Sequence, residues 1–381
     1  MTGTSPSLAY FRDLGDRVEQ KTRDGDEEAF ADIVDRELER TPPGDAVDVD
    51  ELLDGLLDPL HTGSPQLAPT GVFGQPGVTL YHGREFVIDV YFWNNAVPAI
   101  HNHPFSGVFT LLRGHSIHSE YRFENVESLG PRAAAGTLRP AGLSLIREGD
   151  RVPFSKSGHA LIHSLVHVPN PTGSMVVRTI RTLEYFRYFP PSFSLAMSEP
   201  DDHVVRQLAL LEMLRRAEHK DYGSHLRRFL GAADFETTFR TISAAYGPYR
   251  EAGRVHELID LARERHGERV DLIPPAIETA YREQQDNALR ERFLDDDGRF
   301  VASVLMCAPD RASAFRLLGE QFGDGDLIGL LEKWAAAAGL VDKTDADRTA
   351  ALNRLLTSPA PEDQALWADT ILRSLAVVAG A

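Results

Sequence analysis

The spacing of apolar residues along the chain changes character twice. Between Ser7 and about Leu60, apolar side chains recur with helical spacing in FADIVDRELER and VDELLDGLLDPL, and the breaker TPPGD separates these runs. From Gly71 to about Ile180, short β-rich runs such as EFVIDVYFW and GVFTLLRG alternate with Gly, Pro and Asn, which predicts strands joined by turns. After YFPPSFS the helical spacing returns, from VVRQLALLEMLRRAEH through to ALWADTILRSLAVV.

These changes predict an α+β protein with several domains. We expect a helical segment over residues 1–70, a β-barrel over 71–190 and an all-α domain over 195–381. The helices of the last part are amphipathic, so they need a surface on which to bury their apolar stripes. They are expected to pack against the barrel or against a second subunit, which would make the protein a homodimer.

Composition and charge narrow the range of partners. The chain has 57 acidic against 40 basic residues and a formal net charge of −17, so it should repel nucleic acid and anionic lipid. It has no apolar run near the roughly 18 residues that span a bilayer and no basic-then-apolar leader, so a cytoplasmic location is expected. Cys307 is the single cysteine and is interpreted as a small buried hydrophobe. A metal site would therefore depend on His, Asp and Glu.

Two histidine-bearing segments in the β region indicate a metal site. His101 and His103 lie two residues apart in a segment expected to be extended, which puts both imidazoles on one face. About 60 residues later, a second segment carries His159, His163 and His167 at intervals of four. We expect His163 to be the third ligand because it lies within the apolar strand, whereas His159 follows a Ser-Gly turn and remains its main competitor. His167 is then a candidate to orient the ligand or the substrate.

With these residues in place, the sequence resembles the cupin superfamily. The first cupin motif, G…HxH…G, is matched by His101, His103 and Gly114. The second motif, G-D…P…G…H, is matched in order by Gly149, Asp150, Pro153, Gly158 and His163, and His167 stands where the family usually has Asn. The resemblance covers about 110 residues and implies a double-stranded β-helix, or jelly roll.

Within that superfamily, the chain is most similar to the three-histidine thiol dioxygenases of the cysteine dioxygenase type. Many cupins carry a metal-binding Glu four or five residues after the second histidine, where this chain has Gly107 and Val108. The resemblance therefore implies an iron enzyme that uses O₂ on a small-molecule substrate. Fe(II) is the expected metal, and Zn, Mn and Ni remain alternatives.

The resemblance also suggests residues around the substrate. Thiol dioxygenases hold a substrate carboxylate with an arginine on an early strand, which points to Arg84 with Tyr81 beside it. The late strand SMVVRTIRT offers Arg178 but lacks the His and Tyr that the family uses there. His118, in HSIHSEYRFE, is interpreted as a residue on the polar outer face of a strand.

The leading hypothesis is thus an iron-dependent cupin oxygenase acting on a small thiol or anionic metabolite. Two alternatives stay open on the sequence alone. One is a cupin that binds a small molecule without converting it and acts through its helical part. The other is a metal-dependent isomerase or hydrolase, because the same histidines could hold a metal that acts as a Lewis acid.

Overall fold

The N-terminal segment is helical, as its apolar spacing predicted. The computed structural model describes residues 5–22, 29–58, 63–66, 76–94, 99–155, 161–180, 184–198, 200–293, 295–323 and 325–337. The segment forms α1 (Pro6–Lys21), α2 (Phe30–Arg40), the 3-10 turn η1 (Pro43–Asp45) and α3 (Val49–Leu57). The side chains of Ser5 and Asp48 accept hydrogen bonds from backbone N–H groups in the first turns of α1 and α3, which caps both helices.

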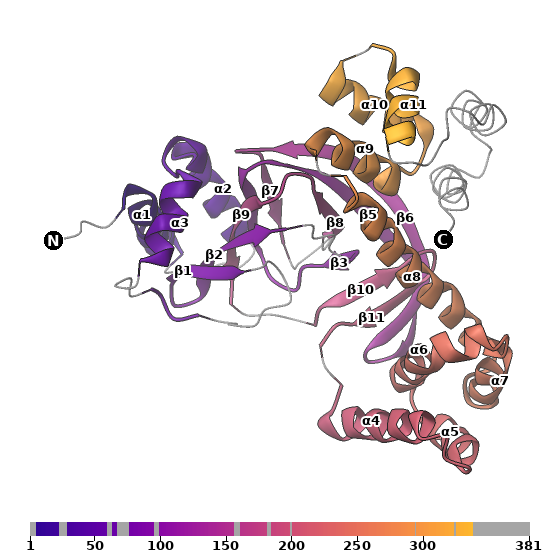
Figure 1. Ribbon diagram of the computed structural model, residues 1–381. Helices are drawn as coiled ribbons and strands as arrows, with labels where there is room; N and C mark the ends of the chain where they lie inside the picture. The colour runs from indigo at the N-terminus through magenta and orange to yellow at the C-terminus, as the bar shows by residue number, and fades with distance from the viewer. Residues whose placement is uncertain are drawn as a thin grey trace.

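The β region folds into two antiparallel sheets (Figure 1). One sheet has the strand order β1-β2-β9-β4-β7, and the other closes on itself in the order β10-β11-β6-β5-β8-β3. The strands are β1 (Gly77–His82), β2 (Phe86–Trp93), β3 (His101–Asn102), β4 (Gly107–Arg113), β5 (His115–Gly130), β6 (Ala133–Arg147), β7 (Arg151–Phe154), β8 (Ile162–His167), β9 (Thr172–Thr179), β10 (Phe186–Phe189) and β11 (Phe193–Ala196).

The strand order is that of a double-stranded β-helix. From β2 to β9 the chain crosses between the sheets at each connection except the β5–β6 hairpin, so β2-β9-β4-β7 and β3-β8-β5-β6 form two four-stranded layers. This is the jelly-roll arrangement that the sequence predicted. The barrel was expected to end at residue 190, but β11 extends to Ala196, because β10 and β11 pair with β3 and β6 and close the second sheet.

The C-terminal part is helical. It contains α4 (Asp202–Arg216), α5 (Tyr222–Leu230), α6 (Phe235–Glu251), α7 (Val255–His266), the 3-10 helix η2 (Gly267–Leu272), α8 (Ile273–Arg290), α9 (Asp296–Cys307), α10 (Arg311–Phe322) and α11 (Leu327–Ala337). The individual runs with helical spacing in the sequence do not include α6 and α8, because α6 contains Gly247-Pro248 and α8 begins near Pro274-Pro275, and both pairs are normally breakers. The expected helix ALWADTILRSLAVV lies outside the described residues.

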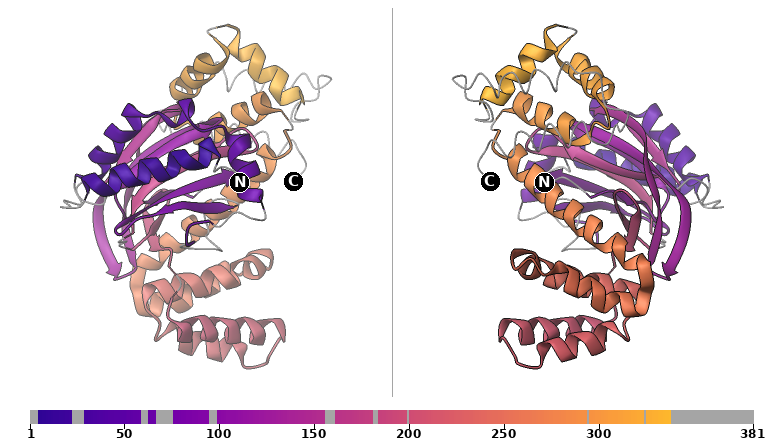
Figure 2. Two further views of the ribbon diagram at one scale, coloured as in Figure 1. Left: turned by 90° about the vertical axis from the view of Figure 1, so that its left-hand side faces the viewer. Right: turned by 90° about the vertical axis from the view of Figure 1, so that its right-hand side faces the viewer.

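Helices cover the barrel on several sides (Figures 1 and 2). The N-terminal helices pack on the first sheet, where Phe11 and Val34 join Ile88 and Met175 in one apolar cluster. A second cluster joins α9–α11 to β5 and β8, and a third joins α5–α8 to β10 and β11. The helical part therefore packs against the barrel, which is one of the two surfaces expected for it.

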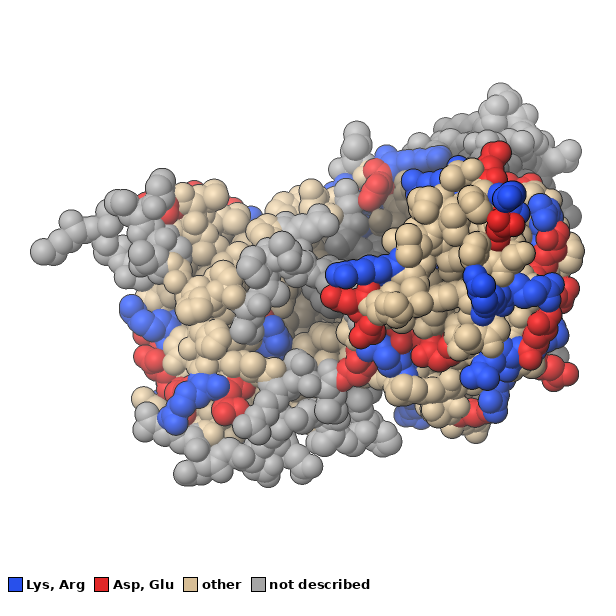
Figure 3. All heavy atoms as spheres, turned by 90° about the horizontal axis from the view of Figure 1, so that it is seen from below, with Lys and Arg blue, Asp and Glu red and all other residues tan. Residues whose placement is uncertain are grey.

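The surface of the helical part carries charges of both signs. Seen from below, Lys and Arg are interspersed with Asp and Glu over this part of the molecule (Figure 3). Many of these groups pair, as Arg227 does with Glu264 and Arg263 with Asp271. No helix in the described part of the chain combines the length and the apolarity that crossing a bilayer requires.

Candidate metal centre

The pairing of β3 with β8 brings three histidines together. His101 lies directly opposite His163 in the register of these strands, and His103 follows two residues after His101. One ring nitrogen from each of the three lies within 4.8 Å of the others, and Nε2 of His103 is 2.7 Å from Nε2 of His163. The structure thus brings together the three histidines that the sequence predicts as metal ligands. His159, the competitor for the third position, lies outside the described residues.

The spacing and the chemistry of these nitrogens fit a single transition-metal ion. Imidazole nitrogens bind such ions at about 2.0–2.1 Å, so two ligands at a right angle lie about 3 Å apart. No carboxylate belongs to this cluster among the described residues. At Gly107, one of the two positions where many cupins carry a glutamate, a Cβ atom would lie 2.2 Å from the Val177 carbonyl oxygen, so a side chain has no room there.

Burial keeps the three imidazoles neutral, which metal binding requires. It lowers the pKa of His101 to about 4 and the pKa of His103 and His163 well below the usual value. The pKa of His103 is lowered further by His101, His118 and Arg178. At neutral pH the cluster therefore offers lone pairs and carries no positive charge of its own.

Hydrogen bonds at the far side of two rings direct their Nε2 atoms to the cluster. Nδ1 of His101 lies 2.7 Å from the Ala99 carbonyl oxygen, so it donates, and the lone pair of the neutral ring is on Nε2. Nδ1 of His163 lies 2.8 Å from Nε2 of His118. If His163 binds a metal through Nε2, its Nδ1–H donates to His118, which then carries its own proton on Nδ1, 3.7 Å from a Glu120 oxygen.

The sequence interpretation of His118 was wrong. Its side chain is only 2% exposed and faces the cluster instead of solvent, and burial lowers its pKa to about 4. The cause is the register of β5 against β8, which places Glu120 opposite His163 and His118 two residues along on the same face. The signal in the sequence was the i, i+2 spacing of His118 and Glu120, but its meaning depended on that cross-strand register.

Replacing His118 with Phe is expected to weaken metal binding by about 10- to 100-fold, because the partner that orients His163 is lost while the ring volume stays similar. Titration of the apoprotein with Zn²⁺ against a competing chelator measures this change. His203→Phe, at an exposed position, is the control and should bind as the wild type does. Equal affinities for the two variants would show that His118 does not orient a ligand.

A buried polar cluster adjoins the histidines. Arg178 forms an ion pair with Asp89 at 2.9 Å, and its guanidinium lies over the ring of Phe105, 4.9 Å from the centroid. Tyr91 donates to Asp89, and the ring of Tyr185 lies 5.8 Å from Phe105. Because Phe105 in turn contacts His103, with 5.2 Å between ring centroids, the predicted site residue Arg178 lies beside the cluster.

Tyr81 and Arg84, the substrate anchors expected from the family resemblance, lie elsewhere. The Arg84 side chain is 71% exposed and its Nε bonds to Glu19 of α1 at 2.9 Å. The Tyr81 hydroxyl bonds to Asp16, also of α1. Since β1 is the edge strand of its sheet and contacts α1, these side chains serve the packing of the N-terminal helices. The structure does not bring them to the three histidines.

His167 is buried but does not join the cluster. It lies four residues after His163 on β8, its Nδ1 is 2.8 Å from the Ser116 hydroxyl, and its ring stacks on Trp93 with 4.5 Å between centroids. Burial lowers its pKa to about 3. These contacts indicate a packing role in the barrel interior, in place of the ligand- or substrate-orienting role predicted for it.

His167 should make the apoprotein less stable in acid. Its pKa is about 3 in the folded state against about 6.5 when unfolded, so below pH 6.5 the unfolded chain binds one more proton, and stability is lost as the pH falls. The loss approaches about 1.4 kcal/mol per pH unit for this one group. Urea denaturation at pH 6, 5 and 4 gives the free energy of unfolding at each pH. This free energy should fall less steeply with decreasing pH in His167→Gln than in wild type, by about 1.4 kcal/mol per pH unit. An unchanged slope would contradict the prediction.

Comparison with known proteins gives distant structural similarity alone. No family model matches the chain, and no curated protein matches it. The DMSP lyase DddQ from Ruegeria pomeroyi is 14% identical over 26% of this chain and 41% of its own length, with a TM-score of 0.18. A cupin-2 domain protein from Rhodospirillum rubrum is 10% identical over 43% of this chain and 85% of its own, with a TM-score of 0.22.

A protein with a double-stranded β-helix domain from Klebsiella pneumoniae is similarly distant. It is 15% identical over 36% of this chain and 91% of its own length, with a TM-score of 0.20. The chain spans less than half the length of the DMSP lyase that it matches. The fold assignment therefore follows from the strand order, and the chemistry has to be inferred from the residues of the site.

Proposed function

We propose that this chain is a mononuclear non-haem iron enzyme of the cupin type that oxidises a small anionic or thiol-bearing metabolite with O₂. The observation that carries the proposal is the all-histidine donor set of His101, His103 and His163, with no carboxylate in that cluster among the described residues. When bound there, Fe(II) retains its full positive charge and supplies redox chemistry with O₂ together with an attachment point for a substrate heteroatom.

The surrounding residues can bind the substrate and exclude water. Arg178 is held in place by Asp89, and its planar guanidinium suits a substrate carboxylate. Phe105 and Phe154 contact His103, with Phe154 stacked at 4.4 Å between centroids, and these rings keep solvent from that side of the cluster. Burial raises the pKa of both Tyr91 and Tyr185, so their hydroxyls remain protonated, and the Tyr91 hydroxyl donates to Asp89, the partner of Arg178.

Arg178→Lys is expected to raise the KM for an anionic substrate by about 10- to 100-fold while metal content stays at the wild-type level. Lysine keeps the positive charge beside Asp89, but it cannot form the bidentate pair of N–H···O hydrogen bonds that a guanidinium donates to a carboxylate. Steady-state kinetics beside elemental analysis test this. The matched control is Arg84→Lys, an exposed arginine paired with Glu19, which should leave KM unchanged. A KM effect in Arg84→Lys alone would place the anchor in the turn between β1 and β2.

The proposed function is tested by loading the purified protein with iron and following O₂ uptake with a panel of thiols and amino acids. About one iron per chain and thiol-dependent uptake would support it. Iron binding without O₂ uptake for any compound would contradict it and favour a binding role. Turnover under strict anaerobiosis with Mn, Ni or Zn would replace the oxygenase with an isomerase or hydrolase.

A further inference from the structure

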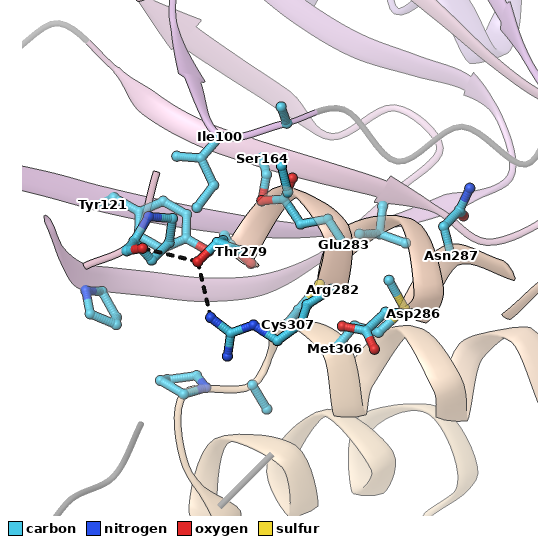
Figure 4. Close-up of a pocket in the computed structure, with 18 of the residues that line it drawn as sticks. Ile100, Tyr121, Ser164, Thr279, Arg282, Glu283, Asp286, Asn287, Met306 and Cys307 are labelled. Atoms are coloured by element: carbon cyan, nitrogen blue, oxygen red, sulfur yellow. Dashed lines mark hydrogen bonds between the residues drawn. The ribbon is translucent and has the colours of Figure 1, made fainter. Parts of the chain in front are cut away.

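A cavity lies between the barrel and the helices. It has a volume of about 510 Å³, and its wall is formed by β5 and β8 on one side and by α8 and the end of α9 on the other (Figure 4). This volume is within the usual range for small-molecule sites. Ser164 in its wall directly follows His163, and adjacent residues of a strand face opposite sides of the sheet. His101, His103 and His163 do not line this cavity, so it is distinct from the three-histidine cluster, although Glu120, on the histidine face of β5, also reaches its wall.

The cavity wall holds polar groups that lack partners. The Asn287 side-chain oxygen and Nε of Arg187 are buried and have no hydrogen-bond partner among the described residues. The wall also holds the Ser119 hydroxyl, which is only 3% exposed and interacts with Tyr121 and Cys307. Buried polar groups are nearly always paired in folded proteins. A hydroxyl can donate and accept, the amide oxygen accepts, and the guanidinium Nε donates, so the wall is complementary to a ligand that has both donors and acceptors.

The charges of the wall favour a neutral ligand. Carboxylates and guanidiniums both line it, namely Glu120, Glu283, Asp286, Arg187 and Arg282. Arg187 already donates to Glu283 at 2.6 Å, and Arg282 donates to Thr279 at 3.0 Å, the latter bond being drawn in Figure 4. An anion would be repelled by the carboxylates of the wall, and a cation would be repelled by its guanidiniums. A neutral molecule can use both kinds of group as hydrogen-bond partners.

Part of the wall is apolar. Val166, Met306 and Pro309 lie there beside Cys307, and burial raises the pKa of the Cys307 thiol to about 12, so this side chain adds apolar surface and is no nucleophile. We propose that this cavity binds a neutral polyhydroxylated molecule, a sugar or a polyol. Its hydroxyls pair with Ser119, Asn287 and the paired charges, while its C–H face packs on the apolar side.

Isothermal titration of the full chain with D-glucose, myo-inositol and glycerol tests the proposal, with phosphate and glycine as charged comparison ligands. The concentrations stay in the low millimolar range, below those at which polyols stabilise proteins by exclusion. At least one polyol should bind, and Ser119→Ala and Asn287→Ala should each weaken it by about tenfold. The control Ser128→Ala changes an exposed serine and should bind as the wild type does.

His103→Ala separates this proposal from the proposed function, because a variant without a metal site should still bind the polyol. A second measurement needs no variant and therefore serves if a cavity variant fails to fold. In wild-type protein, bound polyol should slow amide hydrogen exchange in α8 and β5 at least severalfold. Binding of phosphate or glycine in place of the polyols, no binding of any polyol, or wild-type affinity in both cavity variants would overturn the proposal.

Discussion

The variant with His101 and His103 both changed to alanine is expected to lose tight metal binding while its far-UV circular dichroism stays close to wild type. Two of three ligands are removed, so affinity should fall well beyond the 10- to 100-fold typical of losing an outer partner. The fold should survive because the barrel interior is held by apolar residues such as Phe109, Leu111 and Val176. Elemental analysis after dialysis, beside a chelator titration, measures the loss.

The control for this variant is His82→Ala, which removes an exposed imidazole at the end of β1. It should retain metal as the wild type does. Global unfolding of the double variant would mean that the histidines themselves hold β3 against β8. Retention of about one metal per chain would show that the metal lies elsewhere, and the proposed function would then fail with it.

Local sequence pattern was sufficient to predict much of the barrel. Strands and helices were identified because alternation with period two and apolar spacing near 3.6 are properties of short segments. The HxH pair was interpretable for the same reason, since residues two apart in an extended segment share a face. His163 was preferred over His159 because of its apolar neighbours, and the pairing of β3 with β8 places it opposite His101.

What the sequence did not predict depends on contacts between distant segments. The role of His118 follows from the register of β5 against β8, which no local pattern specifies. The choice between Arg84 and Arg178 depends on which strand α1 covers, and α1 holds Arg84 by an ion pair from 65 residues away. The cavity between α8 and β5 is likewise formed only when the helical part packs on the barrel.

Gly107→Ala should destabilise the protein by about 3 kcal/mol, the upper part of the range for overpacked cores. An added Cβ would lie 2.2 Å from the Val177 carbonyl oxygen and 3.0 Å from Cα of Arg178. Both atoms belong to the backbone of β9, which is hydrogen-bonded between β2 and β4 and cannot move aside. Urea denaturation of the apoprotein measures the effect. Gly142→Ala is the control, because its Cβ would meet only the Glu120 side chain at 3.6 Å, and its stability should stay within about 1 kcal/mol of wild type.

The close approach of Gly107 to β9 also limits which side chains can become ligands of the metal site. Many cupins place a carboxylate near this position, so Gly107→Glu would add the fourth ligand if the backbone allowed it. The close approach of β9 predicts instead that Gly107→Glu is less stable than Gly107→Ala and binds metal no better than wild type. A stable Gly107→Glu protein with tighter Mn²⁺ or Ni²⁺ binding would show that the strands can separate there. The absence of a carboxylate at position 107 would then be a choice of side chain, whereas the present geometry makes it a consequence of how closely β4 and β9 pack at that position.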